Sequence, residues 1–330
     1  MPFLYDAPVR TVPSRSPPAP LSAVDIFLQQ ILNGLTLGSI YALVALGYTM
    51  VYGILGLINF AHGEVVMIGA LTSLAAVRPL ADSGLPGPVV ALVGLAVAAV
   101  ACMLLGFTIE RVAYRPLRHA PRLAPLITAI GVSIVLQNLA MLIWGRNYFS
   151  VPSLLPAQPR NFFGAEITDL QILIMVAAAL TMAGLMLLVH RTRLGRAMRA
   201  TAENPAIAGL MGVDANRIIS ITFVIGSALA ALAGVLISAN YGVAHYGMGF
   251  TLGMKAFTAA VLGGIGNLAG AMVGGVLLGV IEALGAGYIS DFTGGFLGSN
   301  YQDVFAFFVL IVVLIFRPSG LMGEKVAERA

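Results

Sequence analysis

The sequence has few charged residues. Only 10% of its 330 residues are Asp, Glu, Lys or Arg, whereas ordinary soluble domains carry about 25%. Hydrophobic residues make up 59% and the mean hydropathy is +0.94. This composition leaves no room for a sizeable soluble domain and predicts a polytopic protein in the lipid bilayer. We expect no nucleic-acid partner for such a chain.

The sequence has one cysteine and lacks several catalytic motifs. The single Cys102 excludes an intrachain disulfide, and no Cys or His spacing resembles a metal site. The chain has no Gly-x-x-x-x-Gly-Lys-Ser/Thr phosphate loop, so any ATP hydrolysis must come from another polypeptide. No Ser/Lys, paired-Asp or His-x-x-x-His arrangement suits intramembrane hydrolysis. We therefore predict a protein that is not an enzyme and binds no cofactor.

The apolar stretches predict an all-α membrane helix bundle, since about 20 apolar residues cross the hydrocarbon core. They lie at 26–77, 89–109, 124–144, 170–190, 217–240, 251–286 and 303–316. The first must contain at least two crossings, and 251–286 holds one long helix or two short, interrupted ones. Hydropathy gives eight helices, or ten with interrupted helices counted. We predict one transmembrane domain over 25–322, a tail at 323–330, and a disordered proline-rich tail or a misassigned start at 1–24.

Arginine placement predicts the orientation of the helices. Four arginines fall in residues 111–122 and five in residues 191–217, so both loops should be cytoplasmic. If both chain ends are also cytoplasmic, three crossings precede residue 78 and three follow residue 240.

A polar run, Asn59 to Glu64, interrupts the first apolar stretch. A charge at the bilayer centre costs at least about 2.5–3.5 kcal/mol, so such residues are usually functional or paired with a neighbour. Asn59, His62 and Glu64 are therefore candidates for a translocation pathway. In the alternative, His62 and Glu64 pair with each other or with neighbouring helices and only fix the packing.

The glycine-dense segment around Gly264, Gly266 and Asn267 has two interpretations, plain helix packing or a second helix interruption. Small residues at four-residue spacing allow close helix packing, while unwound backbone at membrane depth would line a cavity. Asn-Phe-Ala at 59–61 and Asn-Leu-Ala at 267–269 each follow a Thr-Leu-Gly, which suggests paired interruptions of the kind found in transporters. Lys255 is expected to pair with Glu282.

The loop 191–217 contains a predicted short helix. Asn204 is a suitable N-cap and Pro205 suits the first turn. Ile207, Leu210 and Met211 then form an apolar stripe. The stripe would dock into a cytosolic partner, or lie on its own membrane domain or in the lipid interface.

Several of these segments together resemble one transporter family. They are Asn33 to Leu43, Gly47 to Gly53, Asn59 to Glu64, Glu110 to Arg118, Ala202 to Asp214, Lys255 to Gly266 and Arg317 to Leu321. In this order they are similar to the branched-chain amino acid permeases of ABC importers, LivH type. The resemblance covers roughly residues 26–322.

The resemblance implies a translocation subunit of the prokaryotic plasma (inner) membrane that works by alternating access. Its partners would be a second related permease, two cytosolic ATP-binding subunits that carry the ATP, and an extracytoplasmic solute-binding protein. The substrates would be leucine, isoleucine and valine; urea, amides and other amino acids are the alternatives. The loop 191–217 would couple to the ATPase through Glu203, Asn204, Pro205, Ile207, Leu210, Met211, Gly212 and Asp214.

A proton-coupled secondary transporter is the rival hypothesis. In that case Glu64, His62 and Lys255 would relay protons and no ATPase would be needed.

Overall fold

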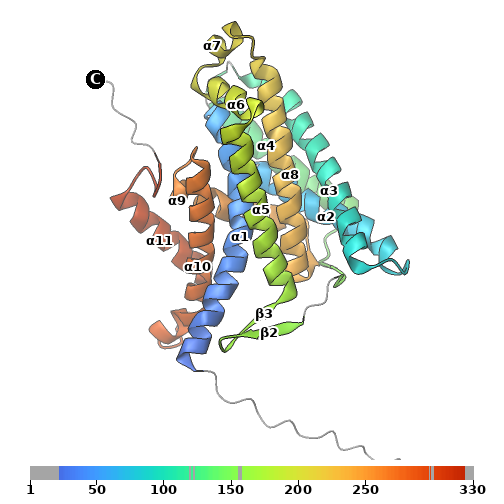
Figure 1. The fold of residues 1–330 in the computed structure, drawn as a ribbon, viewed down its shortest axis with the longest axis vertical. Helices are drawn as coiled ribbons and strands as arrows, with labels where there is room; N and C mark the ends of the chain where they lie inside the picture. The colour runs from blue at the N-terminus through green and yellow to red at the C-terminus, as the bar shows by residue number, and fades with distance from the viewer. Residues whose placement is uncertain are drawn as a thin grey trace, which may run out of the picture.

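The fold is a bundle of long helices, described here from a computed structural model (Figure 1). The structure describes residues 22–118, 120–121, 123–154, 158–296, 298 and 301–323. Residues 1–21 of the predicted N-terminal tail and residues 324–330 of the predicted C-terminal tail lie outside the described residues.

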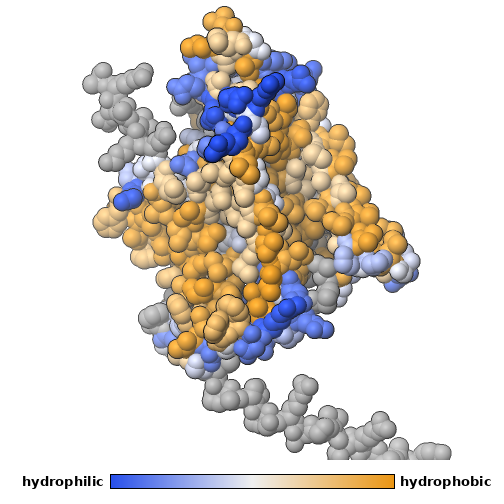
Figure 2. Space-filling model, in the orientation of Figure 1, coloured by the Kyte–Doolittle hydropathy of each residue, from blue (hydrophilic) through white to orange (hydrophobic). Residues whose placement is uncertain are grey.

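Within the described residues, seven helices are long and apolar enough to cross a membrane. They are α1 (Ala23–Leu55), α2 (His62–Ala81), α3 (Gly87–Ile109), α4 (Leu123–Trp144), α5 (Asp169–Arg191), α8 (Ala215–Tyr241) and α10 (Leu268–Phe292). Two shorter apolar helices accompany them, α9 (Met248–Gly263) and α11 (Gln302–Phe316). A broad hydrophobic band lies between two hydrophilic ends (Figure 2). The predicted polytopic helix bundle is confirmed.

The length of helix α1 contradicts the predicted number of crossings in the N-terminal part of the chain. Its 33 residues form one continuous helix, about 50 Å long at 1.5 Å per residue. A capping box between Ser22 and Asp25 starts it, and Gly56 in the left-handed conformation ends it. Residues 22–81 thus hold two membrane helices, so the prediction of three crossings before residue 78 is wrong. Within the described residues, three apolar helices follow residue 240, of which only α10 meets the length for a membrane span, so three crossings there stay a prediction.

The two ends of the bundle carry different small elements. The arginine-rich end, at the top of Figure 1, has α6 (Arg193–Glu203), α7 (Pro205–Leu210), the π-helical η1 (Glu110–Tyr114) and the 3-10 turn η2 (Arg115–Leu117). The opposite end has, among the described residues, two antiparallel strand pairs. These are β1 (Phe149–Ser150) with β4 (Val243–Ala244), and β2 (Pro159–Phe162) with β3 (Ala165–Thr168). The start of α1 lies at this opposite end (Figure 1).

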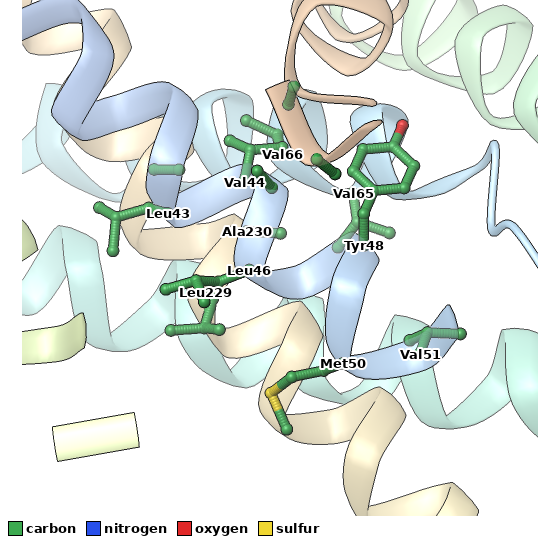
Figure 3. Close-up of a cluster of buried hydrophobic side chains, with 14 of the residues drawn as sticks. Leu43, Val44, Leu46, Tyr48, Met50, Val51, Val65, Val66, Leu229 and Ala230 are labelled. Atoms are coloured by element: carbon green, nitrogen blue, oxygen red, sulfur yellow. The ribbon is translucent and has the colours of Figure 1, made fainter. Parts of the chain in front are cut away.

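Helix α1 is central to the core, and every residue from Gly38 to Val51 is buried. Figure 3 shows Leu43, Val44 and Leu46 of α1 beside Val66 of α2 and Leu229 of α8. Glycines let α1 and α10 pack backbone to backbone: a Cβ on Gly38 would lie 2.8 Å from the Cα of Val276. This close approach is what small residues at helical spacing permit.

A charge cluster in which Glu282 is buried and Asp303 partly exposed joins α9 to α10 and α11. The Nζ of Lys255 lies 2.7 Å from Oε1 of Glu282 and 2.7 Å from Oδ1 of Asp303. The hydroxyl of Tyr41 on α1 donates to Oε2 of Glu282 at 2.9 Å. The predicted pairing of Lys255 with Glu282 is confirmed, and Asp303 is an additional partner.

Candidate functional site

The predicted polar run forms the turn between α1 and the start of α2. The Oδ1 of Asn59 accepts a hydrogen bond from the backbone N–H of Ala61 at 3.2 Å and one from the Tyr114 hydroxyl at 3.1 Å. Asn59 is buried. Its side chain therefore closes the turn and ties it to η1, the continuation of α3.

His62 and Glu64, both buried in the first turn of α2, contact different neighbouring helices. The His62 ring lies edge-on to Tyr48, with 4.9 Å between ring centroids, and its Nε2 has no hydrogen-bond partner among the described residues. It fills the space left by Gly47, where any side chain would collide with the ring. Glu64 instead faces α4, where the Ser133 hydroxyl donates to Oε1 at 3.1 Å.

The carboxylate of Glu64 is incompletely satisfied. Its side chain is 1% exposed, and Oε2 has no hydrogen-bond partner among the described residues. The Oε2 atom lies against Gly249 at the start of α9, so closely that a Cβ there would collide with it. A buried, unpaired carboxylate is costly, and such groups within membrane segments mark functional sites by default.

A pocket of about 300 Å³ lies beside Glu64, between α4 and α9, and we call it the α4–α9 pocket. Its walls are mainly apolar, with polar groups from Tyr48, Ser133 and Gln137. The full lining is Tyr48, Phe60, Ile130, Ser133, Ile134, Gln137, Gly249, Phe250, Gly253 and Met254. Glu64 itself is not in the lining; it lies immediately behind Ser133 and Gly249.

Of the two interpretations of the glycine-dense segment, the structure contains the helix interruption, between α9 and α10. Gly264 and Gly266 take φ values of 107° and 95°, which L side chains rarely adopt. Asn267 caps α10 by accepting from the N–H of Gly270 at 3.0 Å, and its Nδ2 donates to the carbonyl of Met322 at 2.9 Å. The glycine-dense segment is thus both a helix break and, further along α10, a packing surface.

The C-terminal segment holds this break in place. The N–H groups of Leu321 and Met322 donate to the carbonyls of Leu262 and Gly263, each at 2.9 Å. Gly264 packs against the backbone of Gly323.

The structure places the predicted pathway residues around two breaks rather than in one cavity. Gly264 and Asn267 contact the C-terminal segment, and Gly266 lines a second pocket of about 130 Å³ beside Gly53 of α1. Of the predicted residues, Glu64 lies nearest to the α4–α9 pocket, through Ser133 and Gly249.

Sequence reasoning did not identify Ser133 and Gln137. A signal was available, because they are polar residues four positions apart in the apolar stretch 124–144 and so share one helix face.

The predicted short helix in the loop 191–217 is confirmed as α7. The Asn204 side chain caps it by accepting from the N–H groups of Ala206 and Ile207 at 3.0 and 3.1 Å, and Pro205 is its first residue. Helix α7 lies at the tip of the arginine-rich end (Figure 1).

The side chains of the apolar stripe on α7 are exposed. Ile207, Leu210 and Met211 are 58%, 86% and 80% exposed. The described part of the chain therefore leaves this stripe uncovered.

The remaining predicted residues of this loop shape its ends. Glu203 is the last residue of α6, and Gly212 turns the chain with φ at 81°. Asp214 caps α8 by accepting from the N–H groups of Asn216 and Arg217 at 2.9 and 3.2 Å. Asp214 thus has a structural role in addition to any contact with a partner.

Comparison with known proteins gives matches along most of the chain. Residues 30–314 match the family model described as "Branched-chain amino acid transport system / permease component". The chain is 51% identical to the high-affinity branched-chain amino acid transport system permease protein BraD of Pseudomonas aeruginosa, over 92% of this chain and 98% of BraD. It is 47% identical to LivH of Escherichia coli K12, over 92% and 97% of the two chains.

A more distant relative is named for a different substrate. The fructose import permease protein FruG of Bifidobacterium longum is 26% identical over 92% of each chain.

Proposed function

The chain belongs to the permease family of branched-chain amino acid transport systems, and we propose that it is the membrane subunit of an ATP-driven importer of leucine, isoleucine and valine. The observation that carries this proposal is the 51% identity to BraD over nearly the whole of both chains. A relative named for fructose import shares the family at 26% identity. Family membership alone therefore leaves the substrate open, and the closer relatives favour branched-chain amino acids over urea and amides.

The proposed assembly contains a second related permease, two cytosolic ATP-binding subunits and an extracytoplasmic solute-binding protein, in the prokaryotic inner membrane. Two features support it. The chain has no phosphate loop, so ATP must act on other subunits. The exposed stripe of Ile207, Leu210 and Met211 is a small apolar ridge on a capped helix, which suits a groove in a cytosolic partner.

Transport would proceed by alternating access within a single membrane domain, residues 25–322. ATP binding would close the ATPase dimer and move α7, and the two permease bundles would rock about a central pathway. We assign that pathway to the surroundings of the two helix breaks, with Asn59, His62 and Glu64 at one and Gly264, Gly266 and Asn267 at the other. Helix breaks of this kind supply backbone groups and helix ends that can meet a zwitterion transiently.

Reconstitution in proteoliposomes tests the proposal. Vesicles with the full complex, loaded with ATP and supplied with the binding protein, should accumulate labelled leucine. Isoleucine and valine should compete, urea should not, and collapse of the proton gradient should have no effect. Uptake driven by pH with this chain alone would establish the proton-coupled rival instead.

The coupling role of α7 has its own matched test. Leu210→Asp places a charge on the exposed stripe, whereas Gly209→Asp places the same charge on the opposite side of the same helix, where no atom lies within 4 Å of a Cβ. We expect Leu210→Asp to abolish co-purification of the ATPase and Gly209→Asp to retain it. Retention in both variants, with normal uptake, would instead assign the stripe to the lipid interface.

A further inference from the structure

We propose that the α4–α9 pocket binds the transported amino acid as a zwitterion, with Ser133 and Glu64 recognising the ammonium group and Gln137 the carboxylate. This inference rests on the proposed function and specifies where in the membrane domain the substrate is held. Three independent observations support it: an unsatisfied buried carboxylate, two polar groups on one helix face, and apolar walls of suitable size.

The first observation concerns Glu64. Glu64 is only 1% exposed. One carboxylate oxygen accepts a hydrogen bond from Ser133, and the other has no hydrogen-bond partner among the described residues. The neighbouring pocket wall is formed by Ser133 and Gly249. Because the attraction between charges is strong where water is excluded, an ammonium group in the pocket would be stabilised by this carboxylate. The Ser133 hydroxyl oxygen, which still has accepting capacity, would contact it directly.

The second observation concerns the face of α4. Ser133 and Gln137 are four residues apart, so they lie one above the other and both line the pocket. The amide of Gln137 has two N–H donors, which suit a carboxylate. An α-amino acid carries its ammonium and carboxylate groups on the same α-carbon, so a pair of polar side chains one helical turn apart, with about 5–6 Å between their Cβ atoms, can contact one group each.

The third observation concerns the other walls. Phe60, Phe250 and Met254 also line the pocket, and their apolar surface would take an aliphatic side chain. The volume of about 300 Å³ lies at the lower end of the range for small-molecule pockets, about 300–1,000 Å³. The pocket is therefore suited to a single small solute.

This arrangement would also discriminate between α-amino acids and uncharged solutes. Urea and amides lack an ammonium group and gain nothing from the charge of Glu64, whereas every α-amino acid does. Because Ser133 stands between Glu64 and the pocket, the attraction is indirect. Such a site can attract the substrate and still release it, as a transport pathway requires.

The test uses the complete complex in proteoliposomes with saturating, leucine-loaded binding protein. Glu64→Gln keeps the shape and can still accept the Ser133 hydrogen bond, but it removes the charge. We expect leucine transported per ATP hydrolysed to fall at least tenfold, with partial recovery in Glu64→Asp. Normal transport in Glu64→Gln would overturn the inference, because it would show that only the hydrogen bond to α4 matters.

Adjacent residues of α4 give a matched pair of variants. Gln137 lines the pocket, whereas Asn138 is exposed on another face and donates to the carbonyl of Ile134 at 2.8 Å. Gln137→Ala should reduce leucine transport at least fivefold, and Asn138→Ala should leave it unchanged. Equal effects of the two variants would contradict the assignment of the carboxylate to Gln137.

Chemical protection gives a readout that does not depend on turnover. In a Cys102→Ala background, Gln137→Cys should react with a small methanethiosulfonate reagent and be protected by leucine, while leucine should not change the extent of any reaction of Asn138→Cys. Absence of protection at position 137 would overturn the inference. Failure of the unmodified complex to transport leucine with ATP would instead overturn the proposed function, so the two failures are distinguishable.

Discussion

Replacement of Lys255 by methionine should destabilise the bundle by leaving Glu282 buried without its cation. The Nζ of Lys255 is 2.7 Å from a carboxylate oxygen of Glu282 and 2.7 Å from one of Asp303. At an effective dielectric constant of 20, each contact corresponds to a gross attraction of about 6 kcal/mol. Desolvation of the ions offsets several kcal/mol per ion, so the net contribution of the cluster is small.

Removal of one partner has a different energetic consequence from removal of both. The Glu282 side chain is 2% exposed, and orphaning such a charge costs about 3–5 kcal/mol. We therefore expect Lys255→Met to lower the free energy of unfolding by about that amount. The double variant Lys255→Met with Glu282→Gln removes both charges and should recover at least about 2 kcal/mol of the loss. Asp303→Asn should cost no more than about 1 kcal/mol, because that side chain is 38% exposed.

The measurement is equilibrium unfolding by SDS in mixed micelles. Fluorescence of Trp144, the only tryptophan of the chain, reports the transition, with far-UV circular dichroism as a second probe. If the double variant is as unstable as Lys255→Met or less stable, the cluster is not held by the charge pairing described above, and the reasoning is refuted.

Three further predictions follow from local contacts. Gly38→Ala places a Cβ 2.8 Å from the Cα of Val276 and should lower the free energy of unfolding by about 1–3 kcal/mol through overpacking. The control Gly131→Ala, whose Cβ would have no atom within 4 Å, should not destabilise the protein. Equal SDS midpoints for the two variants would refute the described α1–α10 packing. Asn267→Ala should lower stability by about 1 kcal/mol through loss of the α10 cap; the exposed Asn138→Ala is the control, and equal unfolding free energies would refute the cap assignment. Cys102 is fully buried and should react with a maleimide in SDS but not in mild detergent; rapid labelling of the folded protein, followed by mass spectrometry, would contradict the position of α3 against α2.

Features that depend on neighbouring residues in the sequence could be predicted well. The cap at Asn204, the helix start at Pro205 and the break at Gly264 and Gly266 all follow from local backbone preferences, and the structure contains each of them. The ion pair between Lys255 and Glu282 could be predicted because a buried charge in an apolar bundle has few available partners.

Features that depend on which helices meet could not be predicted in the same way. The prediction of three N-terminal crossings rests on the assumption that the N-terminus is cytoplasmic. Hydropathy could not correct that number, because it does not distinguish a continuous helix of 33 residues from two crossings with a tight turn. The tie between Asn59 and Tyr114 and the contact between Glu64 and Ser133 join residues 55 and 69 positions apart. Nothing in the local sequence specifies such long-range partners.

The contacts of α9 suggest how the α4–α9 pocket can change its width. Lys255 ties α9 to α10 and α11, the C-terminal segment binds the end of α9 at the helix break, and Gly249 and Gly253 pack directly on the backbone of Gly63.

Helix α4 has fewer such contacts. It packs on α2 and η1, and many of its side chains, such as Ile127 and Leu142, are exposed on the bundle surface. Movement of α4 would therefore break fewer buried contacts than movement of α9. Helix α4 contacts η1, which lies at the arginine-rich end. A displacement of η1 would therefore move α4, and with it the wall of the pocket that carries Ser133.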